Sequence, residues 1–365
     1  MIQAKSLVTE LDRHEDIGSG RTGEILLDKN ERTIPFPDST FSEIFRAITP
    51  NDLVRYPDQS LLYEKLSSFL HIPSANLLLS NGSDSGIKTI FDTFLSEGDE
   101  ILFLDPTYAM VNVYSDMYGC IPRPVPFGKA LELDPQELLD SISASTKAVI
   151  IANPNQPTGT ILNPESINSL LRKTAECGTL LVVDEAYIEF AGQSSAIRLV
   201  EHYSNLCVLR TFSKAWGLAG LRLGFISAST DLIHQMRKVK SLLDINIIAI
   251  KAASYLIDHY HVVDSYVKDV IYSRDKLIQD FRNNGIEGLP SNTNFIHLRP
   301  PKDIEPSDLE KLMMKKGYRV RMANGTDTIL DGCLRLTVGS TKQMDLLFRD
   351  LLEVMSVDSP KDKST

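Results

Sequence analysis

Residues 148–184 carry the clearest fold signal in the chain: AVIIANPNQPTGTILNPESINSLLRKTAECGTLLVVD. Its two ends, Ala148–Ala152 and Leu180–Asp184, are nearly continuous apolar runs, which are typical of strands covered on both faces of a mostly parallel sheet. Between them, Pro164–Cys177 has the pattern of a helix. This order of strand, helix and strand predicts one unit of an open α/β sheet.

The same alternation extends from about residue 77 to residue 228 and predicts a large α/β domain with a mostly parallel sheet and helices on both faces. The other expected strands are Leu77–Ser80, Glu100–Leu104, Ile121–Pro126, Cys207–Thr211 and Leu223–Ile226, and the other expected helices are Ser83–Leu95 and Tyr108–Met117.

The pattern changes after residue 229 and predicts a second, smaller α+β domain. Helical stretches are expected at 230–261, 263–284, 306–316 and 340–354, with short strands at Asn294–Leu298, Tyr318–Arg321 and Cys333–Val338. We therefore expect a large domain over 40–245 and a small domain made of 1–39 with 246–355. The polar tail at 356–365 is expected to be disordered.

Composition and charge narrow the class of protein. The 365 residues include 38 basic and 48 acidic ones, a formal net charge of −10, which disfavours a nucleic-acid partner. No apolar run reaches the roughly 18–20 residues that a membrane span needs, and no signal peptide is recognisable. Four scattered cysteines show no metal-binding spacing and favour a reducing cytoplasm.

The chemistry is concentrated in segments that follow the predicted strands, where an open α/β sheet binds its ligands. The first is LLLSNGSDSG, residues 77–86, in which a strand, a glycine-containing turn and a helix follow one another. Free N–H groups at a helix N-terminus favour a phosphate group. Plain helix capping by Ser83 or Asp84 is the alternative.

Two further segments offer polar groups at strand ends. In NPNQPTG, residues 153–159, a fixed turn directs the amide of Asn153 above the sheet, unless the segment is only a tight turn. In LLVVDEAY, residues 180–187, Asp184 ends a buried strand. A buried carboxylate needs a cation, which is either a protonated heterocyclic nitrogen or a nearby lysine or arginine.

The last segment is RTFSKAWGLAGLRLG, residues 210–224. Lys214 follows a strand and precedes small residues, so it is a candidate amine nucleophile, and Ser213 and Arg222 suit an anion beside it. Lys214 follows Asp184 by 30 residues and Asp184 follows Asn153 by 31, about one βα unit each. A phosphate cradle, a carboxylate, an amide and a lysine along one sheet edge together indicate pyridoxal phosphate.

With these motifs the chain resembles the fold-type I pyridoxal-phosphate aminotransferases, and among them most closely the histidinol-phosphate aminotransferase family. The resemblance extends from LLDKNE at residues 26–31 to LRLTVGS at residues 334–340. It implies that Lys214 binds the cofactor covalently and moves protons, and that Asp184 keeps the pyridine nitrogen protonated. Asn153 and Tyr187 are implied to bind the ring hydroxyl, and Tyr108 to stack on the ring.

The resemblance also implies the phosphate site, the substrate site and the assembly. Gly82, Ser83, Asp84, Ser213 and Arg222 are implied to line the phosphate site. Tyr56 is implied to reach the cofactor phosphate of a second subunit, which predicts a homodimer with shared active sites. Arg335 is implied to bind the α-carboxylate of the amino donor, and Arg321 the anionic end of the substrate.

Two segments depart from the family pattern in the part of the site that receives substrate. Arg32 adds a cation near the N-terminal site segment, and Leu243–Asn246 replaces a Pro-Tyr-Asn motif. Arg32 is either a surface residue or a substrate residue that suits an extra phosphate or carboxylate group.

The expected reaction is amino transfer between glutamate and a small phosphorylated substrate, with histidinol phosphate as the default. Decarboxylation of phosphothreonine or phosphoserine is the alternative. A DNA-binding regulator with an aminotransferase-like domain is disfavoured, because too few residues precede the first motif.

Overall fold

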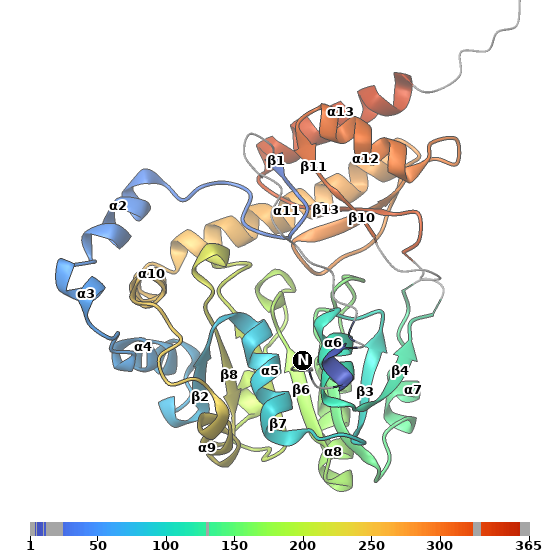
Figure 1. Ribbon diagram of the computed structural model, residues 1–365. Helices are drawn as coiled ribbons and strands as arrows, with labels where there is room; N and C mark the ends of the chain where they lie inside the picture. Colours follow the sequence, from blue (N-terminus) through green and yellow to red (C-terminus); the bar gives the residue numbers. More distant parts are fainter. Residues whose placement is uncertain are drawn as a thin grey trace, which may run out of the picture.

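The structure is a computed structural model that describes residues 25–128, 131–323 and 330–357, together with Ala4, Ser6–Thr9 and Leu11. Its largest element is a seven-stranded sheet with the strand order β2-β8-β7-β6-β5-β3-β4 (Figure 1). All neighbours in this sheet are parallel except for β8, which runs antiparallel to β7 and β2. The strands are β2 Leu77–Ser80, β3 Glu100–Asp105, β4 Ile121–Pro126, β5 Thr146–Ala152, β6 Leu180–Asp184, β7 Leu206–Thr211 and β8 Gly224–Ala228.

The sheet is buried on both faces, as the apolar runs predict. Along β5, Val149 and Ile151 belong to one apolar cluster of the core, whereas Ala148 and Ile150 belong to the other. This alternation follows from the two-residue period of a strand, which sends successive side chains to opposite faces. The prediction of a mostly parallel sheet with apolar residues on both sides is confirmed.

Helices connect the strands, and α8 illustrates how the sequence defines their ends. Asn163 caps α8 by accepting a hydrogen bond from the Ser166 backbone N–H at 2.8 Å, and Pro164 occupies the first turn. Gly178 ends the helix in the left-handed conformation at φ +68°. The helices of this half are α1 Ser6–Thr9, α2 Asp38–Arg46, α3 Pro50–Val54, α4 Ser60–Leu70, α5 Gly82–Phe94, α6 Met110–Tyr118, α7 Pro135–Asp140, α8 Pro164–Cys177 and α9 Thr230–Val239.

Two small sheets lie beyond the strand ends on one side of the large sheet, at the top of Figure 1. One has the order β12-β13-β10-β9, and the other pairs β1 with β11. Residues near the start of the chain therefore pair with residues about 290 positions later. The elements are β1 Ile25–Leu26, β9 Glu287–Gly288, β10 Phe295–Arg299, β11 Tyr318–Arg319, β12 Arg321–Met322, β13 Leu334–Thr337, α10 Ile247–Asp258, α11 His261–Asn283, α12 Pro306–Lys315 and α13 Thr341–Val357.

Two expectations for this part of the chain are wrong. The helical stretch predicted at 230–261 is interrupted between Val239 and Ile247, because Asn246 starts a new helix by accepting a hydrogen bond from the Ala249 N–H at 2.8 Å. The strand predicted at Tyr318–Arg321 is two strands, since β11 pairs with β1 and β12 pairs with β13.

The predicted division into domains at residues 39/40 and 245/246 stays a prediction. Of the predicted disordered tail, Ser356 and Val357 belong to α13 and residues 358–365 lie outside the described residues. Among the helices of the described residues, none combines the length and the apolar character that crossing a bilayer requires.

Candidate active site

A cavity of about 460 Å³ lies where the carboxyl ends of the parallel strands face the small sheets. Side chains from both parts of the chain line it, which matches the place where open α/β sheets bind ligands. The predicted site residues that line this cavity are Ser83, Asp84, Tyr108, Asp184, Tyr187, Ser213, Lys214, Arg222, Arg321 and Arg335.

Lys214 lies in the loop after β7, and side chains on either side of it in the sequence, Arg210 and Trp216, bind Glu189. The loop leaves β7 after Thr211, and a buried ion pair fixes its base: Arg210 Nη2 donates to Glu189 Oε1 at 2.6 Å. Trp216 Nε1 donates to the same carboxylate oxygen at 3.1 Å. The Nζ of Lys214 donates to the Lys29 carbonyl at 3.0 Å and lies 5.6 Å from the centre of the Tyr187 ring. The amine is therefore positioned inside the cavity.

Asp184 ends β6 in the cavity with 7% of its surface exposed. Its Oδ1 accepts a hydrogen bond from the Ala186 N–H at 3.1 Å. Burial, with a smaller contribution from Glu185, raises the pKa of this carboxyl to about 7. Among the described residues no lysine or arginine forms an ion pair with Asp184, although the charge of Lys214 opposes the rise in its pKa.

Three segments meet at the start of α5. Gly82 has φ +79°, and a Cβ atom there would lie 2.6 Å from Arg222 Nη2. A Cβ on Gly224 would lie 2.8 Å from the Ser83 backbone nitrogen. Arg222 Nη1 also donates to Ser213 Oγ at 3.4 Å. The two glycines thus let a guanidinium, a hydroxyl and the N-terminus of a 13-residue helix approach one another.

This arrangement suits an anion better than it suits a self-contained helix cap. The N-cap residue Asn81 makes no side-chain capping hydrogen bond. Ser83 and Asp84 line the cavity, and Tyr114 donates to Asp84 Oδ1 at 3.2 Å. A helix N-terminus together with an arginine favours a phosphate group.

Aromatic side chains form the middle of the cavity. The hydroxyl of Tyr187 accepts a hydrogen bond from Asn30 Nδ2 at 3.0 Å, and its ring packs edge-to-face on Phe295 at 5.4 Å. Burial and the carboxylates of Asp84 and Asp184 raise the pKa of Tyr108, so this phenol stays neutral. Lys29 and Asn30 also line the cavity. The sequence analysis included them only as part of the LLDKNE motif and did not select them as site residues.

Arg321, Arg335 and His297 form a row on the wall that the four-stranded sheet contributes. Arg321 pairs with Arg335 across β12 and β13, and Arg335 pairs with His297 across β13 and β10. Arg335 Nη2 donates to the Asp28 carbonyl at 2.7 Å. Directly opposite residues of antiparallel strands project to the same side, so the three side chains share one face. Sequence analysis did not select His297.

Comparison with known proteins agrees with this geometry. A family model described as aminotransferase class I and II matches residues 22–351. The chain belongs to this family of aminotransferases. Histidinol-phosphate aminotransferase 1 of Carboxydothermus hydrogenoformans is 34% identical over 335 residues, which are 91% of this chain and 93% of the relative. The predicted family and fold class are confirmed.

Solved structures share the fold of this aminotransferase. Histidinol-phosphate aminotransferase from Sinorhizobium meliloti, solved with pyridoxal-5′-phosphate, superposes with a TM-score of 0.86 at 24% identity and covers 98% of both chains. L-threonine-O-3-phosphate decarboxylase from Porphyromonas gingivalis superposes with a TM-score of 0.75 at 22% identity, covering 91% of this chain and 99% of its own.

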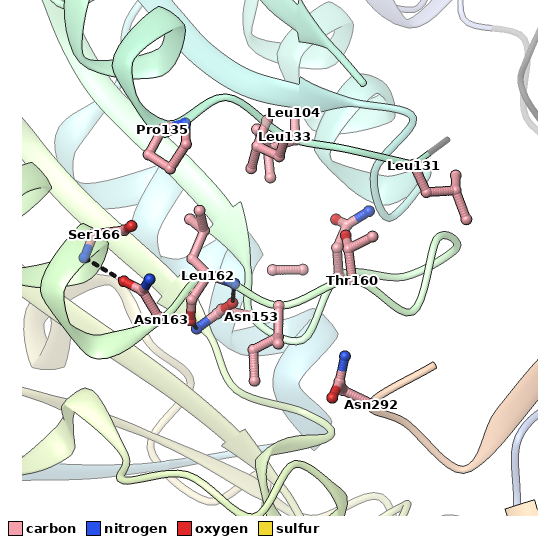
Figure 2. A pocket seen from close by; sticks show the side chains of 13 residues that line it. Leu104, Leu131, Leu133, Pro135, Asn153, Thr160, Leu162, Asn163, Ser166 and Asn292 are labelled. Carbon is pink, nitrogen blue, oxygen red and sulfur yellow. Dashed lines mark hydrogen bonds between the residues drawn. The ribbon is translucent and has the colours of Figure 1, made fainter. Parts of the chain in front are cut away.

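The structure corrects the assignment of Asn153. Its side chain is turned to the backbone of Leu162: Oδ1 accepts from the Leu162 N–H at 2.7 Å, and Nδ2 donates to the Leu162 carbonyl at 3.3 Å. Figure 2 shows Asn153 in a separate cavity of about 300 Å³, with a dashed line to Leu162. Asn153 therefore stabilises the turn of the aminotransferase instead of lining its main cavity.

Gln156, three residues later, occupies the position expected of Asn153. It lines the main cavity, and its Oε1 is buried without a hydrogen-bond partner among the described residues. A buried amide oxygen without a partner is costly unless a ligand supplies the donor. The NPNQPTG motif located the turn, but the sequence did not tell which of its amides faces the cavity.

Arg32 fits neither of its two interpretations. Its guanidinium lies 4.5 Å from the centre of the Phe36 ring and 4.0 Å from that of Tyr266, and Nε donates to the Ile34 carbonyl at 3.1 Å. Arg32 does not line the cavity. Its side chain packs against Gly217, and its guanidinium is a cation between two aromatic rings. The segment Leu243–Asn246 does not line the cavity either.

Two other predicted residues lie outside the cavity lining. Gly82 acts through the close approach of Arg222, as described above. Tyr56 is 83% exposed and belongs to an open segment after α3. Within the part of the chain that the structure describes, no contact brings Tyr56 to the site.

Proposed function

We propose that the chain is a pyridoxal-phosphate-dependent aminotransferase that moves an amino group between glutamate and histidinol phosphate, with 2-oxoglutarate and imidazole acetol phosphate as the corresponding carbonyl compounds. One observation carries the proposal: a lysine amine, a buried carboxylate without an ion-pair partner among the described residues and two arginines share one cavity. The aminotransferase family and the relatives named histidinol-phosphate aminotransferase, which are 30–34% identical, support it.

The residues present fit pyridoxal phosphate. When bound, this cofactor supplies an electron-accepting ring that holds the amino group between the two halves of the reaction. Among the described residues Asp184 has no ion-pair partner, and a protonated pyridine nitrogen would provide one. Gln156 Oε1 is buried without a donor among the same residues, and Arg222 beside the N-terminus of α5 suits a phosphate group.

We assign each residue a role from its place in the cavity. Lys214 Nζ is the amine that would bind the cofactor. Once the amino donor has replaced it there, the free Nζ would move a proton to and from the substrate carbon. Asp184 stabilises positive charge at the ring nitrogen. Tyr187 and Gln156, which line the cavity, would hold the polar substituent of the ring, and Tyr108 would pack on the ring. Ser83, Asp84, Ser213 and Arg222, with Gly82 behind them, would hold the phosphate group.

The arginines account for the binding of two acidic substrates. Glutamate offers carboxylates, and histidinol phosphate offers a phosphate monoester. A guanidinium binds either group through two parallel hydrogen bonds. Arg335 is held by the Asp28 carbonyl and by its packing over Phe295, so its fork has a fixed direction. We propose that Arg335 binds the α-carboxylate of glutamate and that Arg321 assists at the anionic end of the substrate.

We also propose that the active unit is a homodimer located in the cytoplasm. Apolar side chains around the predicted contact residue Tyr56 are exposed, among them Phe41, Leu53 and Val54. Phe41 lies on α2, and Leu53 and Val54 lie on α3, at the left of Figure 1. Exposed large apolar side chains favour a protein partner, and a second copy supplies one. Four cysteines without disulfides suit a reducing compartment.

The test is a full catalytic cycle with the purified, cofactor-loaded protein. Histidinol phosphate and 2-oxoglutarate are expected to yield glutamate, measured enzymatically, in equal amount to the histidinol phosphate consumed. Release of carbon dioxide from phosphothreonine without any need for 2-oxoglutarate would support the decarboxylase instead, in line with the superposition on the decarboxylase structure. Light scattering of the same sample tests the dimer, and a monomeric active enzyme would contradict it.

A further inference from the structure

His297 lines the cavity, yet the proposed reaction assigns it nothing. We propose that His297 is a specificity-determining residue: its imidazole extends the Arg321–Arg335 row and favours a phosphate monoester over a carboxylate at that wall. This inference rests on the proposed function, because it concerns which acidic group of the two substrates the row prefers.

The register of the four-stranded sheet places the three side chains next to one another. Arg321, Arg335 and His297 are cross-strand neighbours in β12, β13 and β10, so adjacent members are separated by one strand spacing of about 4.8 Å. All three line the same cavity. Their nitrogen-bearing side chains form one continuous wall.

Two buried nitrogens along this wall have no hydrogen-bond partner among the described residues. His297 is 1% exposed, and its Nε2 is buried without a hydrogen-bond partner among the described residues. Arg335 Nε, on the neighbouring strand, is buried without a partner as well. Buried polar atoms of folded proteins are nearly always paired, so two orphans beside a cavity indicate that a ligand completes them.

Charge decides what kind of ligand this is. Burial, and then the adjacent Arg335, lower the pKa of His297 to about 3, so the imidazole is neutral in the working range of an enzyme. A neutral imidazole has one N–H donor and one acceptor nitrogen, whereas a guanidinium only donates. The wall therefore presents two positive charges and one uncharged donor, which suits an anion with several acceptor oxygens.

The shape of the anion separates phosphate from carboxylate. A carboxylate has two oxygens in one plane, and a single arginine satisfies both through its fork. A phosphate monoester has three terminal oxygens arranged around phosphorus, so one oxygen remains for a further donor after a guanidinium has bound the other two. We assign that remaining oxygen to His297. The competing explanation is that His297 only packs, since its ring lies edge-to-face on Phe295 at 5.7 Å.

The experiment compares His297→Leu with His297→Gln in the cofactor-loaded enzyme. Leucine removes the donor and keeps a side chain of similar size, while glutamine restores an N–H. His234→Leu, at an exposed histidine on α9, is the matched control. We expect His297→Leu to raise KM for histidinol phosphate roughly tenfold, as loss of a charge-assisted hydrogen bond does. KM for glutamate and kcat for both substrates should stay within about twofold, and glutamine should recover most of the loss.

An equal rise in KM for both substrates, or a fall in kcat alone, would assign His297 a packing role and overturn the proposal. No change in KM for histidinol phosphate in His297→Leu would overturn it too. Thermal unfolding of each variant identifies loss of folding; if His297→Leu does not fold, the same comparison is made with His297→Gln and His297→Asn, in which shortening the amide alone must weaken phosphate binding.

A binding measurement separates this proposal from the proposed function. Propyl phosphate and butyrate carry the two anionic groups on the same short chain and cannot react. Calorimetric titration of the loaded protein should show at least tenfold tighter binding of propyl phosphate, and His297→Leu should reduce that ratio. If the unmodified protein fails to turn over histidinol phosphate but shows this ratio, only the proposed reaction fails. Equal affinity for the two anions in the unmodified protein contradicts the role of His297.

Discussion

The two walls of the cavity differ in how they are built. The wall of the large sheet is a set of strand ends: Asp184 ends β6, and Ser213 and Lys214 follow β7. The wall of the small sheet is a row across three strands, in which Arg321, Arg335 and His297 come together through register. In the proposed function, the first wall binds the cofactor that every turnover needs, and the second wall selects the substrate. Under this proposal, strand ends carry the chemistry and cross-strand register carries the specificity.

Lys214→Ala tests the first wall with the largest expected effect. Removal of the only amine proposed to act in the reaction should lower kcat by more than about 10⁴-fold, because no other group can take over covalent binding and proton transfer. The exposed Lys147→Ala is the control and should keep full activity. Single-turnover kinetics with glutamate measure the loss. A Lys214→Ala enzyme with more than a hundredth of the normal rate would remove the central role of this wall.

Asp184→Asn tests the electrostatics of the same wall through stability. The folded-state pKa of about 7 exceeds the usual value, so the folded protein binds a proton that the unfolded chain releases near pH 4. Stability of the cofactor-free protein should therefore fall as pH rises from about 4 to about 7, by on the order of 4 kcal/mol.

In Asp184→Asn this pH dependence should disappear, which leaves the cofactor-free variant more stable than the parent at pH 8 and similar at pH 4. Turnover of the loaded variant should drop about 10²-fold or more, since the ring nitrogen loses its carboxylate. Denaturant unfolding at the two pH values measures the first effect. Parallel pH profiles for parent and variant would show that Asp184 titrates normally.

Arg335→Lys tests the second wall. Lysine keeps the charge but loses the planar fork that matches carboxylate and phosphate. KM should rise about 30- to 100-fold for both acidic substrates, with a smaller change in kcat. A variant that loses affinity for the cofactor itself, measured by fluorescence titration with pyridoxal phosphate, would mean that the two walls are not separate in function.

Two amide variants have the smallest expected effects, and they distinguish the residue that binds the cofactor from the residue that stabilises the turn. Gln156→Ala should weaken cofactor affinity roughly tenfold with little change in stability, because its Oε1 has no partner within the described chain. Asn153→Ala should destabilise the fold by about 1–3 kcal/mol through loss of two bonds to Leu162. The reverse pattern would restore Asn153 as the cofactor residue.

The sequence alone predicted the first wall well, because its residues lie directly after apolar runs. AVIIA and LLVVD indicated strands, and a residue that follows such a strand lies at the ligand-binding edge whatever the rest of the chain does. The residues alone placed Lys214, Asp184 and Ser213 at this edge, and the family resemblance was needed to assign their roles.

The second wall could be predicted only in part. Arg321 and Arg335 came from the family resemblance, but His297 enters the row only through the pairing of β10 with β13, which joins residues 38 positions apart. Arg32 escaped prediction for the same reason: its partner Tyr266 lies 234 positions later on α11. For Asn153 and Gln156 the missing information was the local direction of each side chain within one turn.

The most direct test of the central claim is the visible absorbance of the cofactor-loaded protein during titration with glutamate. Our account predicts that glutamate bleaches the yellow band and that 2-oxoglutarate restores it, because Lys214 exchanges places with the donor amine in the cavity. A loaded protein whose band is unchanged at saturating glutamate would contradict amino transfer from glutamate.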